Sequence, residues 1–81
     1  AVVISQGLFA AQAQFASGIR ESQQLIQTVE SMIAKTTAAI DYVKLVDANT
    51  LQDTITASEG SVIVVAVILD GIRLIDNHIL V

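Results

Sequence analysis

The residues of this chain that are best suited to specific polar chemistry are Arg73, Asp76 and Asn77, which lie close together near its end. Arginine offers a planar set of donors, and carboxylate and amide groups can accept hydrogen bonds or orient a ligand. In one interpretation these side chains sit at a strand end, where they orient a lid or a contact between domains. In the other, Arg73 pairs with an acid on the neighbouring strand, while Asp76 and Asn77 form a turn and bond to local backbone amides.

Other catalytic or metal-binding patterns are absent from the sequence. His78 is the only histidine. The sequence shows neither the nucleophile and acid that a catalytic triad needs around it nor the further ligands that a zinc site needs. We interpret His78 as a partly exposed strand residue. Asp47, Asn49 and Asp53 resemble a calcium loop, but that loop would need glycine at position 52 and glutamate at position 58. The chain has glutamine and serine there, and its glycines are scattered singly. We therefore predict no catalytic, cofactor-binding or metal-binding residue.

The composition is that of one small, apolar domain. The 81 residues are 53% apolar and only 15% charged, so part of the apolar surface is expected either to fill a tight core or to cover another domain or a second copy.

The net charge is −4 and the basic residues form no run, which argues against nucleic-acid binding. The absence of cysteine fits a cytoplasmic protein. The longest apolar run is too short to span a membrane, and the expected helices lack the basic polar face of membrane-surface helices.

Apolar spacing predicts two helices in the first half of the chain. Ile4, Leu8, Ala11 and Phe15 follow a helical stripe that ends at 17–18, where glycine suits the end of a helix. A second helix is expected to begin near residues 20–22, with serine 22 as its N-cap, and to continue to about residue 35. The two helices form a helical hairpin.

The residue pattern in the second half of the chain predicts strands. Asp70-Gly71 is a strong two-residue hairpin signal, because this turn needs positive φ at both positions. The unbroken apolar run before it has no polar face, so both sides of that strand should be covered. The expected strands are Ile40–Val46, a short edge strand 51–55, Val62–Leu69, and a return strand from Ile72. The expected fold is α+β, an N-terminal helical hairpin packed on an antiparallel sheet of about three strands.

Several motifs along the chain resemble the C-terminal domain of the pantothenate synthetase (pantoate–β-alanine ligase) family. They are, in order, Ser5, Leu8 and Ala11; Gly18 and Arg20; Asp41-Tyr42 with Val46-Asp47 and Thr50-Leu51; and Arg73-Leu74-Ile75-Asp76-Asn77. The resemblance implies that residues 1–81 are one domain, a C-terminal lid fragment of a longer, cytoplasmic ligase. The chain begins with Ala1, and we expect it to be a piece of that longer polypeptide.

The resemblance also implies the chemistry of the complete enzyme. The family condenses pantoate with β-alanine, using ATP and magnesium, through a pantoyl-adenylate, and releases AMP and pyrophosphate. The implied partner is an N-terminal Rossmann-like domain of the same polypeptide, in a parent that is a homodimer and in some members is fused to a cytidylate kinase. The His-x-Gly-His and Lys-Met-Ser-Lys-like signatures of that domain are missing here, so no catalytic residue carries over. We expect the fragment alone to be inactive and to bind no cofactor.

Two alternatives to the lid remain open from the sequence. The first is a free-standing α+β module without catalysis that associates with itself through an apolar sheet face. The second is an unrelated small domain that binds a ligand between helices and sheet, although no polar constellation supports it.

Overall fold

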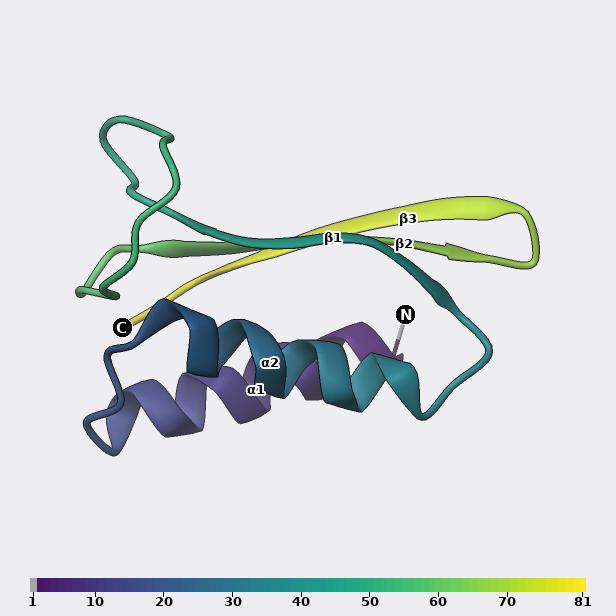
Figure 1. The fold of residues 1–81 in the computed structure, drawn as a ribbon, viewed down its shortest axis with the longest axis horizontal. Coiled ribbons are helices and arrows are strands. Elements are labelled where there is room, and N and C mark those ends of the chain that lie inside the picture. Colours follow the sequence, from purple (N-terminus) through teal and green to yellow (C-terminus); the bar gives the residue numbers. More distant parts are fainter. Residues whose placement is uncertain (1) are drawn as a thin grey trace.

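The fold has two layers, a pair of helices and a three-stranded antiparallel sheet that lies across them (Figure 1). The computed structural model describes the backbone of residues 2–81 and the side chains of residues 4–81. The elements are α1 (Val2–Ala16), α2 (Ser22–Ala34), β1 (Ala39–Val46), β2 (Val62–Leu69) and β3 (Ile72–Ile79). This architecture confirms the predicted α+β fold.

The helices form where the apolar spacing predicts them, with one correction at the start of α2. The predicted stripe of α1 is buried, and Gly18 has a φ of +112° just beyond the helix end. Ser22 is the first helical residue, however, and Glu21 is the N-cap. The reason is that Glu21 is held extended by a bridge to Thr56, while the Ser22 N–H donates to the carbonyl of Ile55 at 3.1 Å.

The predicted two-residue hairpin joins β2 to β3. Asp70 and Gly71 have φ values of +53° and +78°, as this turn requires. The turn sets the register, in which Leu69 faces Ile72. On the other side β2 pairs antiparallel with β1, which makes β2 the central strand of the sheet.

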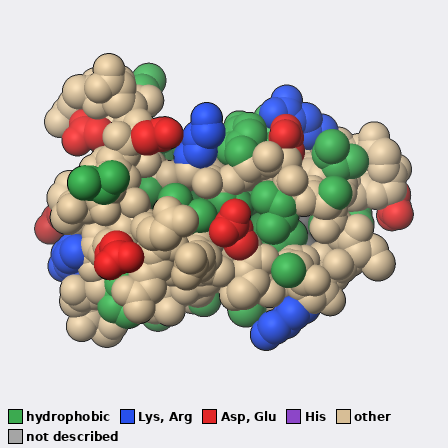
Figure 2. All heavy atoms as spheres, viewed as in Figure 1, with side chains coloured by type: hydrophobic (Ala, Val, Ile, Leu, Met, Phe, Trp, Pro, Cys, Tyr) green, Lys and Arg blue, Asp and Glu red, His purple; other side chains and the backbone are tan. Residues whose placement is uncertain are grey.

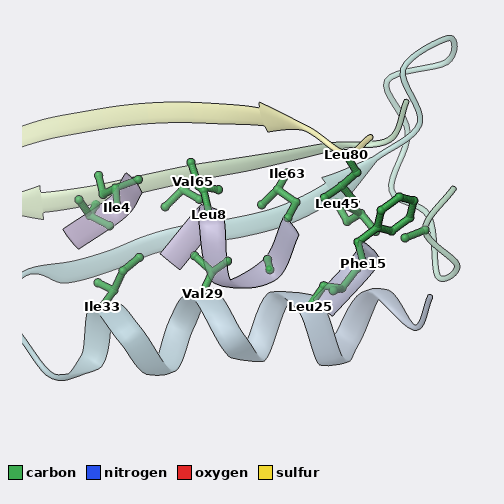
Figure 3. Close-up of a cluster of buried hydrophobic side chains, with 13 residues drawn as sticks. Ile4, Leu8, Phe15, Leu25, Val29, Ile33, Leu45, Ile63, Val65 and Leu80 are labelled. Carbon is green, nitrogen blue, oxygen red and sulfur yellow. The ribbon is translucent and has the colours of Figure 1, made fainter. Parts of the chain in front are cut away.

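The core lies between the sheet and the helices, and it covers only one face of β2 (Figure 3). Ile63, Val65 and Val67 point toward the helices and are fully buried or nearly so. The prediction that both sides of β2 are covered is wrong for the described residues, because both helices pack on the same face of the sheet. We call the opposite side the outer face; it is formed by Tyr42, Lys44, Val46, Val62, Val64, Ala66, Ile68, Arg73, Ile75, Asn77 and Ile79.

A long loop, residues 47–61, connects β1 to β2, and its first part rises above the sheet on the side away from the helices (Figure 1). The predicted edge strand 51–55 is wrong, since this segment forms only an isolated bridge between Val46 and Asp53. Leu51 has a φ of +59°, which turns the chain and interrupts any extended pairing. The loop is instead tied at single points, with the Thr54 N–H donating to the carbonyl of Leu45 at 3.0 Å.

Candidate functional site

Arg73 lies on the outer face, where it pairs with Asp41 across the sheet. Its Nη2 is 2.8 Å from Asp41 Oδ2, and its Nε donates to the same oxygen at 3.1 Å. The partner belongs to β1, so the pair reaches over the central strand rather than to a direct neighbour. The guanidinium also lies 5.9 Å from the centre of the Tyr42 ring. These contacts give Arg73 an ion-pair partner within the chain and leave about half of its side chain exposed.

Asp76 and Asn77 lie inside β3 and form no turn, which corrects that part of the structural interpretation. Two residues in a continuous ladder cannot also reverse the chain, and both are paired with β2, opposite Val65 and Val64. Asp76 Oδ1 accepts the Asn77 N–H at 2.8 Å. Because side chains alternate along a strand, Asp76 points to the helix side and Asn77 to the outer face. The structure thus brings Arg73 and Asn77 to one face and leaves Asp76 on the other.

Because Arg73 and Asp41 are both well exposed, their pair is expected to add little stability. The side chains are 53% and 40% exposed, and exposed ion pairs contribute at most about 1 kcal/mol. We predict that Arg73→Ala lowers the free energy of unfolding by less than about 1 kcal/mol. Urea denaturation of the variant, with Asp41→Ala as its partner control, measures this. A loss several times larger would show that Arg73 holds the sheet together.

The described residues offer no metal centre. Among them, no group of three or more His, Cys, Asp or Glu side chains is placed to hold an ion. Asp47, the first residue of the apparent calcium pattern, instead accepts the backbone N–H groups of Asn49 and Thr50 at 2.8 and 3.1 Å. That geometry is an Asx turn, so the carboxylate serves the loop. Within the described part of the chain, no helix has the length and apolar character to cross a membrane.

A shallow groove of about 230 Å³ lies beside the start of α2. Lys44 and Asp53 supply its only charges, and none of Arg73, Asp76 and Asn77 reaches it. Figure 2 shows apolar side chains at the surface in the seam between α2 and the sheet, with acidic and basic side chains dispersed around it. The residues around the groove are Ser22, Gln23, Ile26, Val43, Lys44, Leu45, Asp53, Thr54 and Ile55. This lining combines apolar side chains with hydroxyl and amide groups and two opposite charges.

One polar network was missed by reasoning from the sequence. Gln12 of α1 holds the end of the chain, since its Nε2 donates to the Val81 carbonyl at 2.7 Å and its Oε1 accepts the Val81 N–H at 3.1 Å. His78 Nε2 lies 3.0 Å from the same Oε1, and the His78 ring meets Phe9 edge-on at 6.2 Å. Gln12 is 66 positions from His78 and 69 positions from Val81 in the sequence, so no local pattern could have revealed these contacts.

The network fixes the proton on His78. The two bonds to Val81 settle the orientation of the Gln12 amide, and its oxygen can only accept. His78 must therefore donate from Nε2, and we predict that nitrogen-15 spectra at neutral pH show the Nε2–H tautomer. Gln12→Ala should yield a mixture of tautomers, while Gln6→Ala, at an exposed position of α1, should not. A proton on Nδ1 in the unmodified chain would contradict this arrangement.

Comparison with known proteins places the chain in a family. The sequence model of the family described as "Pantoate-beta-alanine ligase" matches residues 1–79. The chain belongs to the pantoate–β-alanine ligase family. It is 31% identical over 80 residues to the pantothenate synthetase of Syntrophus aciditrophicus, a match that covers 98% of this chain and 28% of that protein.

A second relative and a solved structure are also similar to this chain. The chain is 36% identical over 81 residues to a bifunctional pantoate ligase/cytidylate kinase of a Nostoc species, covering 99% of this chain and 15% of that protein. Its fold matches the crystal structure of the Thermus thermophilus pantothenate synthetase with a TM-score of 0.86 at 23% identity, covering 96% of this chain and 28% of the other. The chain therefore spans less than a third of the length of these relatives. The resemblance inferred from the motifs is confirmed.

The family motifs that lie outside β3 have structural roles in this chain. Gly18 permits the left-handed turn that ends α1, and Arg20 follows it to contact the last turn of that helix. Asp47 closes the Asx turn after β1. These three motif residues thus contribute to the fold of the domain.

Proposed function

We propose that residues 1–81 are the C-terminal domain of a longer ATP-dependent ligase that condenses pantoate with β-alanine to form pantothenate. The observation that carries this proposal is the family match over residues 1–79. The 28% share of the relatives' length supports a domain within a larger polypeptide. In this proposal the ligase is a cytoplasmic homodimer, and the reaction passes through a pantoyl-adenylate.

ATP and magnesium belong to another part of that ligase. The described residues hold no cluster of carboxylates or histidines for a metal ion, and the chain has no Gly-rich loop to cradle phosphates. The residues present therefore do not fit these groups. We assign the binding of ATP, pantoate and β-alanine to a preceding Rossmann-like domain, and we expect residues 1–81 alone to be inactive.

A lid over the active site is the role proposed for this domain. An acyl-adenylate reacts readily with water, so a cover that excludes water protects it until the amine attacks. The outer face supports this role, because Ile68, Ile75 and Ile79 expose 43%, 58% and 55% of their surface there. Asn77 shares this face, and we propose that it and Arg73 contribute polar contacts to the neighbouring domain.

The same outer face favours one alternative, a free-standing module that associates with itself. Apolar surface of this kind commonly marks an interface. Sedimentation of the 81-residue chain over a wide concentration range distinguishes the two proposals. The lid predicts a monomer, whereas the module predicts a dimer that dissociates on dilution.

Activity measurements test the proposed function. We expect the complete protein, meaning the polypeptide that contains residues 1–81, to form pantothenate, AMP and pyrophosphate only when ATP, pantoate and β-alanine are all present. The purified 81-residue chain should form none. Turnover by the short chain would overturn the lid proposal, because this domain would then contain the active site.

A further inference from the structure

The groove beside the start of α2 contains a hydroxyl group that the fold does not use. Ser22 lines this groove and is only 6% exposed, yet its hydroxyl forms no hydrogen bond with the other described residues. Every fully enclosed side-chain polar atom in the described part of the chain has a partner, so the Ser22 hydroxyl must reach the open space of the groove. It does not cap α2 either, because Glu21 is the N-cap. The hydroxyl can therefore donate to a ligand.

The first turn of α2 adds a backbone donor to the groove. Glu21 makes no side-chain bond to the helix that it precedes. The Gln24 N–H donates to the Glu21 carbonyl at 3.2 Å, whereas the Gln23 N–H has no backbone acceptor among the described residues. Gln23 lines the groove next to Ser22. Unused N–H groups at a helix N-terminus favour a carboxylate, so this donor and the buried Ser22 hydroxyl form one half of a polar site.

Two opposite charges lie at the same groove. Lys44 and Asp53 both line it, and the ion pair that the described side chains form joins Arg73 to Asp41 instead. Lys44 Nζ is within 5.4 Å of the centre of the Tyr42 ring, a contact that leaves its charge available to a ligand. A simple anion would be repelled by the Asp53 carboxylate. The two charges are complementary to a ligand that carries one charge of each sign.

The apolar lining and the size of the groove restrict the ligand further. Ile26, Val43 and Ile55 contribute aliphatic side chains from α2, β1 and the loop. The volume of about 230 Å³ lies below the roughly 300–1,000 Å³ of pockets that hold drug-sized ligands. The ligand that fits should therefore be small and should carry an aliphatic group beside its two charges.

We propose that this groove binds a free aliphatic amino acid as a zwitterion. The ligand carboxylate accepts from the Ser22 hydroxyl and the Gln23 N–H, with Lys44 contributing positive charge. The ligand ammonium donates to Asp53, and the aliphatic side chain contacts Ile26. This site goes beyond the proposed ligase, whose substrates we assign to the preceding domain, and it does not depend on that function.

Titration of the nitrogen-15-labelled 81-residue chain with L-leucine tests the site. The amide resonances of Gln23, Val43 and Ile55 should shift together and saturate, with a dissociation constant of about 1 mM, because a shallow groove gives a small ligand few contacts. The resonance of Gly71 should not move, since the β2–β3 turn lies at the far end of the sheet from the start of α2 (Figure 1). The absence of a saturable shift would overturn the proposal.

Three related compounds test each part of the ligand on the unmodified chain. Leucinamide lacks the carboxylate, 4-methylpentanoate lacks the ammonium, and β-alanine lacks the aliphatic side chain. Each should bind at least about tenfold more weakly than L-leucine. If any of the three binds as tightly, the corresponding half of the site is not used, and the groove does not recognise an aliphatic zwitterion.

Substitutions test the two side chains that carry the proposal. Asp53→Asn should weaken L-leucine binding at least about tenfold, whereas Glu59→Gln, at an exposed position of the same loop, should not. Ser22→Ala should weaken binding about fivefold and leave the urea midpoint unchanged, because the hydroxyl stabilises nothing in the fold. Ser31→Ala, at an exposed position of the same helix, is its control. Unchanged affinity in Asp53→Asn or in Ser22→Ala would overturn the proposal.

Discussion

Ile63→Ala should cost about 2–5 kcal/mol of folding free energy, the range for removing a large aliphatic side chain from a packed core. Ile63 is fully buried, on the face of β2 that meets the helices (Figure 3). A domain of this size is stable by about 4–12 kcal/mol, so the substitution removes a large part of the total. Urea denaturation should show a lower midpoint with an unchanged slope.

Ile75→Ala is the matched control for this prediction. The same side chain is removed, but from the outer face, where Ile75 is 58% exposed. We expect the free energy of unfolding of the 81-residue chain to change by no more than about 1 kcal/mol, as is usual at exposed positions. Equal effects at the two positions would contradict the assignment of one covered and one open face. In the complete protein, a larger loss of folding free energy on Ile75→Ala than in the 81-residue chain would indicate that the outer face is covered there.

Arg20→Ala should cost about 2 kcal/mol, an unusually large effect for a surface residue. Arg20 Nη1 donates to the carbonyl of Phe15 at 2.5 Å and to that of Ile19 at 3.2 Å. Its guanidinium also stacks 3.9 Å above the centre of the Phe15 ring. The arginine therefore adds a second donor to a carbonyl in the last turn of α1, which also accepts the Gly18 N–H at 3.1 Å, and it covers a core aromatic side chain.

Arg20→Lys tests which part of this interaction matters. Lysine keeps the charge but lacks the planar guanidinium that stacks and donates at the same time. We expect the lysine variant to recover less than half of the folding free energy that Arg20→Ala loses. Thermal unfolding of the two variants measures this. If lysine restores full stability, the charge alone explains the role of Arg20, and stacking on Phe15 contributes nothing.

Elements set by local signals were predictable from the sequence. The Asp70-Gly71 hairpin formed as expected because its turn chemistry depends on two adjacent residues. The stripe from Ile4 to Phe15 predicted its buried face because helical periodicity is also local. The segment 51–55 was predicted wrongly because tertiary contacts with β1 and α2 decide its conformation, and those contacts leave no pattern in the sequence.

The polar contacts were less predictable for the same reason. An acidic partner for Arg73 was expected on the adjacent strand, but Asp41 reaches it over β2 because long side chains on one face can span two strands. Gln12 lies 66 and 69 positions before His78 and Val81, so only the fold brings these residues together. Family membership was predictable because its motifs are short stretches of sequence, and the family match over residues 1–79 confirms it.

The most direct test of the account is pantothenate formation by the complete protein, with and without residues 1–81. We predict that the intact protein converts pantoate and β-alanine in the presence of ATP, and that deletion of residues 1–81 strongly reduces turnover while the shortened protein still binds ATP. Full activity after deletion would contradict a lid that protects the acyl-adenylate. No activity in the intact protein, with all three substrates present, would contradict the ligase itself.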